Sequence, residues 1–373
     1  MVLVLGRPGA GCSTFLKALT GTDSSMYTGI FGDIEYDGLP RNSMVRHFKQ
    51  DLIYCPELDT HHPHLTVEQT LDFAIRCKMP DKRVNDMSKD DYVKFMREML
   101  ATVFGLRHTF KTKVGNDFIR GVSGGERKRV SIAEALACQG TVYCWDNATR
   151  GLDASTALEY AQAIRVLSKT YTKLFDKVTV LYKGRQIYFG STKEAKAYFE
   201  DMGFECPPRQ STAEFLTAIT DPHGRFPKPG YENKVPRTAE DFEAYWLASD
   251  AFKKLKNEIQ DYKSEQNPDE TKRSLIESIK QQKQRGQRTG SHYTVNFYEQ
   301  FRLNMMRGFQ SMKGDKAYAV TQTIAAIAQS LIVGSLYYNT PNDVSGAFSR
   351  GGVIFFSVFV LVIDGSCRDL QLV

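Results

Sequence analysis

Two glycines that follow a serine, in Ser123-Gly124-Gly125, have the chemistry that is easiest to predict from this sequence. Glycines leave backbone N–H groups uncovered, so the groups can approach an anion closely and form a concave nest. The next residues, 126–137, contain no glycine or proline and have apolar positions at helical spacing. A nest at a helix N-terminus binds phosphate. Such a triplet alone is more often a turn, so the prediction depends on the rest of the chain.

A second glycine-rich loop lies at residues 6–14. It follows the apolar run 2–5 and precedes the helical pattern of residues 15–19, which predicts a strand, a loop and a helix. This is the context of a phosphate-binding P-loop, with one substitution. We expect the loop to bind a nucleotide, and its residues are Gly6, Arg7, Pro8, Gly9, Ala10, Gly11, Cys12, Ser13 and Thr14.

A carboxylate closes the buried-strand pattern at residues 141–146. Asp146 at the end of such a strand is typical of a Walker B motif, whose aspartate holds Mg²⁺. Gly151-Leu152-Asp153 follows at once and predicts a turn before the next helix.

In this order, the P-loop, the Ser-Gly-Gly-Glu signature, the aspartate-ended strand and the Gly-Leu-Asp turn resemble the nucleotide-binding domain of an ATP-binding-cassette (ABC) transporter. The resemblance implies an α/β P-loop NTPase fold with ATP and Mg²⁺ as cofactors. It also implies that Ser13 and Asp146 hold the metal. Each ATP in an ABC dimer lies between the P-loop of one domain and the signature of the other, here Ser123, Gly124, Gly125 and Glu126.

Three substitutions indicate one branch of the family. Cys12 stands at the P-loop lysine, Asn147 at the general-base glutamate, and Glu57 where a glutamine is usual. With them the chain resembles the first nucleotide-binding half of fungal pleiotropic drug resistance (PDR) exporters, which are G-type ABC transporters. The resemblance implies export of hydrophobic compounds from the plasma membrane. The implied partners are a second ABC nucleotide-binding domain, the lipid membrane and hydrophobic small molecules.

These substitutions remove a cation and a base, so we expect ATP binding with very slow hydrolysis at this chain's own site. No residue is therefore a confident catalytic one, although Asn147 and Glu57 occupy catalytic positions. An inert nucleotide-binding module and a non-functional truncated fragment remain as alternative interpretations. The signature is intact, so we expect it to complete the ATP site of a second domain.

Composition excludes little. The chain has 373 residues, enough for two domains, and its net charge of +6 is mixed along the sequence, which gives no reason to expect nucleic acid as a partner. The seven cysteines form no CxxC pair and predict reduced thiols in a cytosolic compartment. His61, His62 and His64 could suggest a metal site, but Pro63 interrupts them and a solvated loop is the favoured interpretation.

The chain order predicts three regions: an ABC nucleotide-binding domain at 1–220 with a helical signature subdomain at about 66–135, a polar linker and helical region at 221–290, and an interfacial connecting helix with a partial transmembrane domain at 291–373. A capping box at Thr66 predicts a helix to about residue 78, and a charged helix follows at 89–104. Residues 239–287 predict a solvated helical hairpin.

Residues 294–313 form an amphipathic pattern that suits either a membrane surface or a packed core. Residues 317–338 contain no charge and are long enough, as a helix, to cross the roughly 30 Å hydrocarbon core. A second apolar run at 351–363 is too short to cross and is interrupted at Asp364. We therefore expect a membrane protein with a cytoplasmic nucleotide-binding domain, and a chain that is part of a longer one.

One expected strand is missing. The helix after Asp153 reaches about residue 169, and residues 174–176 follow almost immediately, where the family has a further strand that usually ends in a histidine. No histidine occurs between His108 and His223. We expect a gap in the sheet, with unpaired backbone groups at its edges.

Overall fold

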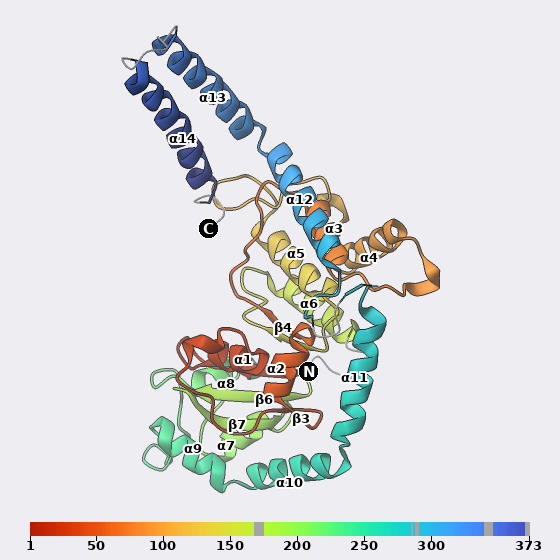
Figure 1. Ribbon diagram of the computed structural model, residues 1–373. Helices are drawn as coiled ribbons and strands as arrows, with labels where there is room; N and C mark the ends of the chain where they lie inside the picture. The colour runs from red at the N-terminus through yellow and green to blue at the C-terminus, as the bar shows by residue number, and fades with distance from the viewer. Residues whose placement is uncertain (168–174, 285, 288–290, 339–345, 370–373) are drawn as a thin grey trace. The chain divides into compact units, whose positions relative to one another are not determined.

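The computed structural model describes residues 1–167, 175–284, 286–287, 291–338 and 346–369, in two compact units, Met1–Arg307 and Gly308–Val373 (Figure 1). The strands are β1 (Val2–Leu5), β2 (Glu35–Tyr36), β3 (Leu39–Pro40), β4 (Leu52–Cys55), β5 (Val142–Trp145), β6 (Lys177–Tyr182) and β7 (Arg185–Ser191). The helices that frame the nucleotide motifs are α1 (Cys12–Thr20), α2 (Arg41–His47), α3 (Val67–Cys77), α4 (Lys89–Val103), α5 (Gly124–Ala137) and α6 (Ala154–Leu167). Later helices are α7 (Ala195–Asp201), α8 (Thr212–Ile219), α9 (Ala239–Ala248), α10 (Asp250–Glu265), α11 (Pro268–Gln282), α12 (Phe297–Gly314), α13 (Lys316–Leu336) and α14 (Ala347–Asp369).

The two strands that carry the phosphate-binding motifs belong to separate sheets. β1 pairs in parallel with β6, which pairs antiparallel with β7, and β5 pairs in parallel with β4. No described strand pairs with both β1 and β5, and a cavity of about 1530 Å³ is lined by residues of both. β1 is apolar throughout, yet none of its residues is fully buried, whereas β6 is buried from its second residue onward. This arrangement agrees with the gap expected in the sheet. Residues 170–174, the place at which the sequence lacks the family's further strand, lie outside the described residues.

The helices of the predicted signature subdomain share an apolar core with Tyr160 and Ile164 of α6. α3, α4 and α5 pack together through side chains that include Leu71, Leu100 and Ile132, which are 0–2% exposed. The predicted capping box is confirmed, because Thr66 accepts from the backbone of Gln69 and the Gln69 side chain accepts from the backbone of Thr66. The predicted helix 89–104 is confirmed as α4. α5 can therefore present its N-terminus from a rigid support.

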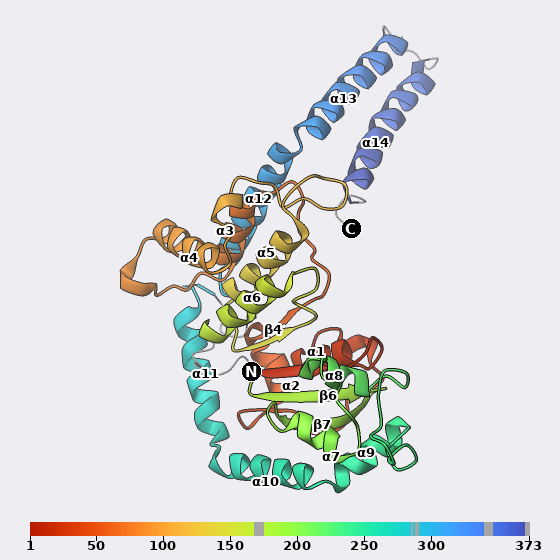
Figure 2. The same ribbon diagram turned by 180° about the vertical axis from the view of Figure 1, so that it is seen from behind.

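A second core surrounds β6 and β7, with α7, α8 and α9 against them (Figure 2). Here the prediction of a solvated hairpin at 239–287 is wrong in two ways. The segment forms three helices, α9, α10 and α11, and α9 is packed on β7 through Phe242 and Trp246, which are 0% and 1% exposed. The average composition of residues 239–287 is polar, and for that reason the prediction did not take account of the aromatic side chains of α9. Residues 221–237 contain no helix, as expected, but Val235 is buried in the same core.

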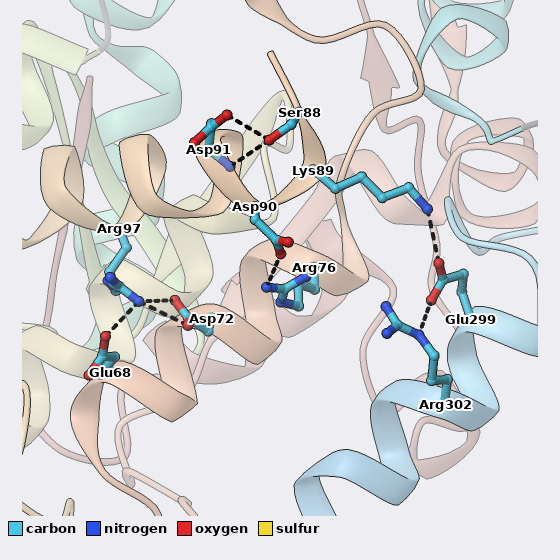
Figure 3. Close-up of polar contacts among 10 residues, drawn as sticks. All are labelled: Glu68, Asp72, Arg76, Ser88, Lys89, Asp90, Asp91, Arg97, Glu299 and Arg302. Carbon is cyan, nitrogen blue, oxygen red and sulfur yellow. Dashed lines mark hydrogen bonds and ion pairs between the residues drawn. The ribbon is translucent and has the colours of Figure 1, made fainter.

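The first turns of α12 are tied to α3 and α4 by one ion pair and one cation–π contact. Glu299 accepts from Lys89 of α4 at 2.9 Å and from Arg302 at 2.8 Å (Figure 3). The Arg307 guanidinium lies 4.2 Å from the ring centroid of Phe73 on α3. The amphipathic helix is confirmed, with one buried side chain, Leu303. Five large apolar residues of the helix are exposed: Phe297, Phe301, Met305, Phe309 and Met312.

In the second unit α13 and α14 lie side by side and run in opposite directions in both views (Figures 1 and 2). α13 covers most of the predicted span 317–338. Within the described residues, however, no helix combines the length and the apolar character that crossing a membrane requires. The second apolar run, 351–363, lies within α14, which continues past Asp364 to Asp369.

Candidate nucleotide-binding site

The P-loop is shaped by glycines at positions where a side chain would not fit. Gly11, the N-cap of α1, has φ 99°, a left-handed conformation that glycine adopts without strain. A Cβ on Gly6 would lie 2.8 Å from Cβ of Ala10 and 2.9 Å from the carbonyl oxygen of Leu181. No side chain caps the first turn of α1. Its N–H groups, on Cys12 to Thr14, have no partner within the helix and are suited to an anion.

The Ser13 hydroxyl and the Asp146 carboxylate meet at the end of β5. Ser13 Oγ donates to Asp146 Oδ1 at 3.1 Å, and Tyr54 from β4 donates to Asp146 Oδ2 at 2.7 Å. Asp146 is only 7% exposed. Burial, and then the bond to Asp146, raise the pKa of Tyr54. A hydroxyl and a carboxylate are hard oxygen ligands of the kind Mg²⁺ prefers, so these two residues fit the metal that the family implies.

Cys12 begins α1 and is half-buried. Burial raises the pKa of the Cys12 thiol, and the nearby Asp146 carboxylate raises it further. The thiol is therefore neutral at physiological pH and adds no charge to the loop. Lys17, one turn further along α1, does not replace the missing cation, because its ammonium pairs with Asp23 at 2.9 Å.

Glu57 crosses from the end of β4 to the residues after Asp146. Its carboxylate accepts from Asn147 Nδ2 at 3.1 Å and forms an ion pair with Arg150. The Arg150 guanidinium, followed by the Asn147 amide, holds the pKa of Glu57 below its usual range. A carboxylate with a lowered pKa is a weaker proton acceptor, so Glu57 is poorly suited to replace a missing general base.

The signature loop is built as a helix N-terminus. Ser123 Oγ accepts from the backbone of Glu126 at 3.3 Å, and the Glu126 carboxylate accepts from the backbone of Ser123 at 2.8 Å. Glu126 also lies 2.9 Å from His108 Nε2, so its carboxylate is committed to the cap and to this histidine. Ser123 and Gly124 are exposed, and a Cβ on Gly124 would meet no atom within 4 Å. The loop is open to a molecule outside this chain.

The cavity between β1 and β5 brings together one part of the predicted site. The signature residues Ser123, Gly124, Gly125 and Glu126 do not line it. Ala10 is not among its lining residues either, because it is buried and its carbonyl accepts from Gly184. The predicted residues that do line the cavity are Gly6, Arg7, Pro8, Gly9, Gly11, Cys12, Ser13, Thr14, Glu57, Asp146 and Asn147.

Sequence reasoning missed Tyr54, Arg150 and Lys128. The position of Tyr54 had a signal, because Tyr54 is opposite Cys144 in the parallel register and its side chain reaches the end of β5. Arg150 had none, since it lies in a turn. The solvated-loop interpretation of the histidine cluster is wrong for His61, whose side chain is only 3% exposed and whose Nε2 lies 2.7 Å from Ser131 Oγ. Within the described residues, no group of three or more His, Cys, Asp or Glu side chains could hold a metal ion.

Comparisons with known families agree with these motifs. Residues 1–150 match the model of the ABC transporter family, and residues 299–366 match the ABC-2 type transporter model. The two matches leave residues 151–298 unassigned. They place the start of a membrane-domain sequence after the nucleotide-binding motifs, in the order that the sequence predicts.

Individual relatives are similar along nearly the whole chain. Protein SNQ2 of Saccharomyces cerevisiae is 57% identical over 98% of this chain and 25% of its own length. The ABC multidrug transporter SNQ2 of Candida glabrata is 58% identical over the same shares of both chains. ATP-dependent permease PDR12 of Saccharomyces cerevisiae is 48% identical over 95% of this chain and 25% of its own length. The chain thus spans about a quarter of the length of these relatives.

Proposed function

The chain belongs to the ABC transporter family and is related to its fungal PDR-type members, and on that premise we propose that it is the ATP-binding portion of a membrane exporter of hydrophobic compounds. In this proposal its own nucleotide site binds ATP without splitting it at a useful rate, while its signature completes a site on a second nucleotide-binding domain. The observation on which the proposal rests is that the P-loop and the Asp146 carboxylate line one cavity. The neutral Cys12 thiol stands at the P-loop position where a lysine is expected.

The groups that would bind ATP are the first-turn amides of α1, on Cys12 to Thr14, because they can donate to phosphate oxygens. Ser13 and Asp146, 3.1 Å apart, would hold Mg²⁺. When bound, the ion supplies positive charge next to the phosphates. These contacts require only the residues of this chain, and we propose residues 6–14 as its nucleotide-binding loop.

Slow hydrolysis follows from three side chains. The neutral Cys12 thiol cannot offset the charge that develops on the phosphates. The Asn147 amide cannot take a proton from water, and Glu57 is held by Arg150 with a lowered pKa. A positioned general base is worth about 10²–10⁴ in rate, so its loss alone explains a large deficit.

The signature would act on the partner's ATP. Ser123 and Gly124 are exposed, lie outside the cavity of the P-loop, and stand at the positive end of the α5 dipole. This placement supports a pair in which the lysine and glutamate come from the second domain. We also propose the division predicted above, with the nucleotide-binding domain at 1–220, a region at 221–290 that adds α9 to the core of that domain, and membrane-associated residues at 291–373.

Attachment to the membrane is supported by the ABC-2 match at 299–366 and by the exposed apolar face of α12. Phe301, Met305 and Phe309, spaced by four residues, would lie at the lipid surface with Arg302 directed elsewhere on the helix. We propose that α13 and α14 enter the bilayer together with further parts of the complete transporter, in the plasma membrane, with the nucleotide-binding domain on the cytoplasmic side.

The proposal predicts different results for binding and turnover. The purified chain should bind a fluorescent ATP analogue in a Mg²⁺-dependent manner, and Asp146→Asn should weaken that dependence. ATP turnover by the chain alone should stay near background and rise at least tenfold when a nucleotide-binding domain with intact lysine and glutamate is added. Equal turnover with and without that domain would reject the asymmetric pair, and absence of nucleotide binding would reject the whole proposal.

One observation favours a second candidate, a nucleotide-binding module without catalysis. Cys12 and Asn147 both remove catalytic groups, and both lie in the cavity that would hold ATP. Nucleotide binding by this chain with no stimulation of any partner would support this alternative.

A further inference from the structure

A buried polar network joins the segment after β4 to α5. Residues 56–61 form neither helix nor strand. Lys128, Ser131 and Glu134 lie three residues apart on α5, so their side chains share one face of the helix. All three contact the 56–61 segment. Because α5 begins at the signature loop, this face connects that loop to the segment that carries Glu57.

Lys128 is the centre of the network and is only 2% exposed. Its ammonium donates to the carbonyl oxygens of Pro56 at 3.1 Å and Glu57 at 3.0 Å, and pairs with Asp59 Oδ1 at 3.3 Å. A lysine ammonium has three donors, and here three acceptors meet it. A buried charge is costly unless it is paired and hydrogen-bonded, so the position of residues 56–59 on α5 is specified closely.

Two further contacts extend the network along the helix. Ser131 Oγ donates to Asp59 Oδ1 at 2.6 Å and lies 2.7 Å from His61 Nε2. His61 Nδ1 lies 3.4 Å from Glu134 Oε2. The segment is thus held at several points along one face of α5.

Glu57 connects this polar network to the nucleotide cavity. Its carbonyl accepts from Lys128, while its side chain contacts Asn147 and Arg150 beside Asp146. A shift of Glu57 when the cavity is filled would therefore be passed through Lys128 to α5. Lys128 lies only three residues after Gly125 of the signature loop, which forms the N-terminus of α5.

We infer that Lys128 is a positioning residue that couples nucleotide occupancy at the P-loop to the conformation of the signature loop, Ser123–Glu126. This inference rests on the proposed function, since it requires that the P-loop binds nucleotide. The coupling is reciprocal: contact of the signature with a partner's ATP must change the affinity of this chain's own site by the same factor.

The test measures hydrogen exchange in peptides that cover Ser123–Glu126, in the full chain in detergent micelles, with and without a non-hydrolysable ATP analogue and Mg²⁺. In the wild type, the analogue should slow exchange at these amides at least threefold. Lys128→Met should abolish the change while the dissociation constant of the analogue, measured separately, changes less than threefold. Lys128→Arg keeps the charge and several hydrogen-bond donors, so it should restore part of the slowing of exchange at Ser123–Glu126. Lys193→Met, at an exposed lysine, is the matched control and should behave as wild type.

Lys128→Met leaves Asp59 without its cation and can unfold the chain, so Lys128→Met/Asp59→Leu is the second variant, in which an apolar pair replaces the ion pair. It should fold, bind the analogue and show no response at the signature. A wild-type response in either variant would overturn the inference. So would analogue binding to the wild type with no change in exchange at Ser123–Glu126, which leaves the proposed function intact. Failure of the wild type to bind the analogue would reject the proposed function and the coupling together.

Discussion

Replacement of Gly124 by aspartate is expected to lower partner-stimulated ATP turnover by about 10²–10³, the usual cost of disturbing one donor to a developing oxyanion. Gly124 is exposed and its Cβ position is empty to 4 Å, so the new side chain fits without disturbing the fold. Its negative charge would face the triphosphate of the partner. The measurement is steady-state turnover of the chain mixed with a catalytically intact nucleotide-binding domain.

Gly124→Asn is the matched control, since asparagine has the shape of aspartate without its charge and should cost less turnover. The affinity of this chain for its own ATP should stay within twofold in both variants, because the signature loop does not line the P-loop cavity. Equal turnover for Gly124→Asp and wild type would exclude contact between this loop and the partner's nucleotide.

The second large effect is expected at Gly121, just before the signature. A Cβ there would lie 2.4 Å from the carbonyl oxygen of Val114 and 2.6 Å from Cα of Gly115, both backbone atoms that cannot rotate away. Gly121→Ala should therefore destabilise the chain by about 3 kcal/mol, at the upper end of ordinary overpacking. Urea unfolding followed by tryptophan fluorescence measures the change.

Gly124→Ala provides the comparison for this prediction. At the start of α5, with free space at its Cβ, alanine should raise stability by about 0.5 kcal/mol, because it reduces the entropy of the unfolded chain. If both substitutions shifted the unfolding midpoint equally, the close approach of the two backbones at Gly115 and Gly121 would not be the cause.

The local structure of the nucleotide motifs could be predicted from sequence because their signals are short-range. The glycine spacing at 6–11 and the two glycines after Ser123 each predict a loop and a helix start within a few residues, and the structure has both. The meeting of Ser13 and Asp146, far apart in sequence, was implied by the family resemblance and not by strand pairing, since β1 and β5 lie in separate sheets.

The contacts that sequence reasoning missed depend on distant partners. Lysine is almost never fully buried unless it is paired, and the acceptors of Lys128 lie about seventy residues earlier in an irregular segment, so no local pattern reveals them. The burial of α9 was missed for a similar reason, because Phe242 and Trp246 find their places on β7.

The most direct test of the account counts how many ATP molecules are split in one turnover of a mixed pair. The chain and a catalytically intact partner domain would be saturated with radiolabelled ATP and quenched within the first turnover. The account predicts two nucleotides bound per pair, with one converted to ADP and the other intact on the Cys12 side. Conversion of both in that first turnover would contradict it.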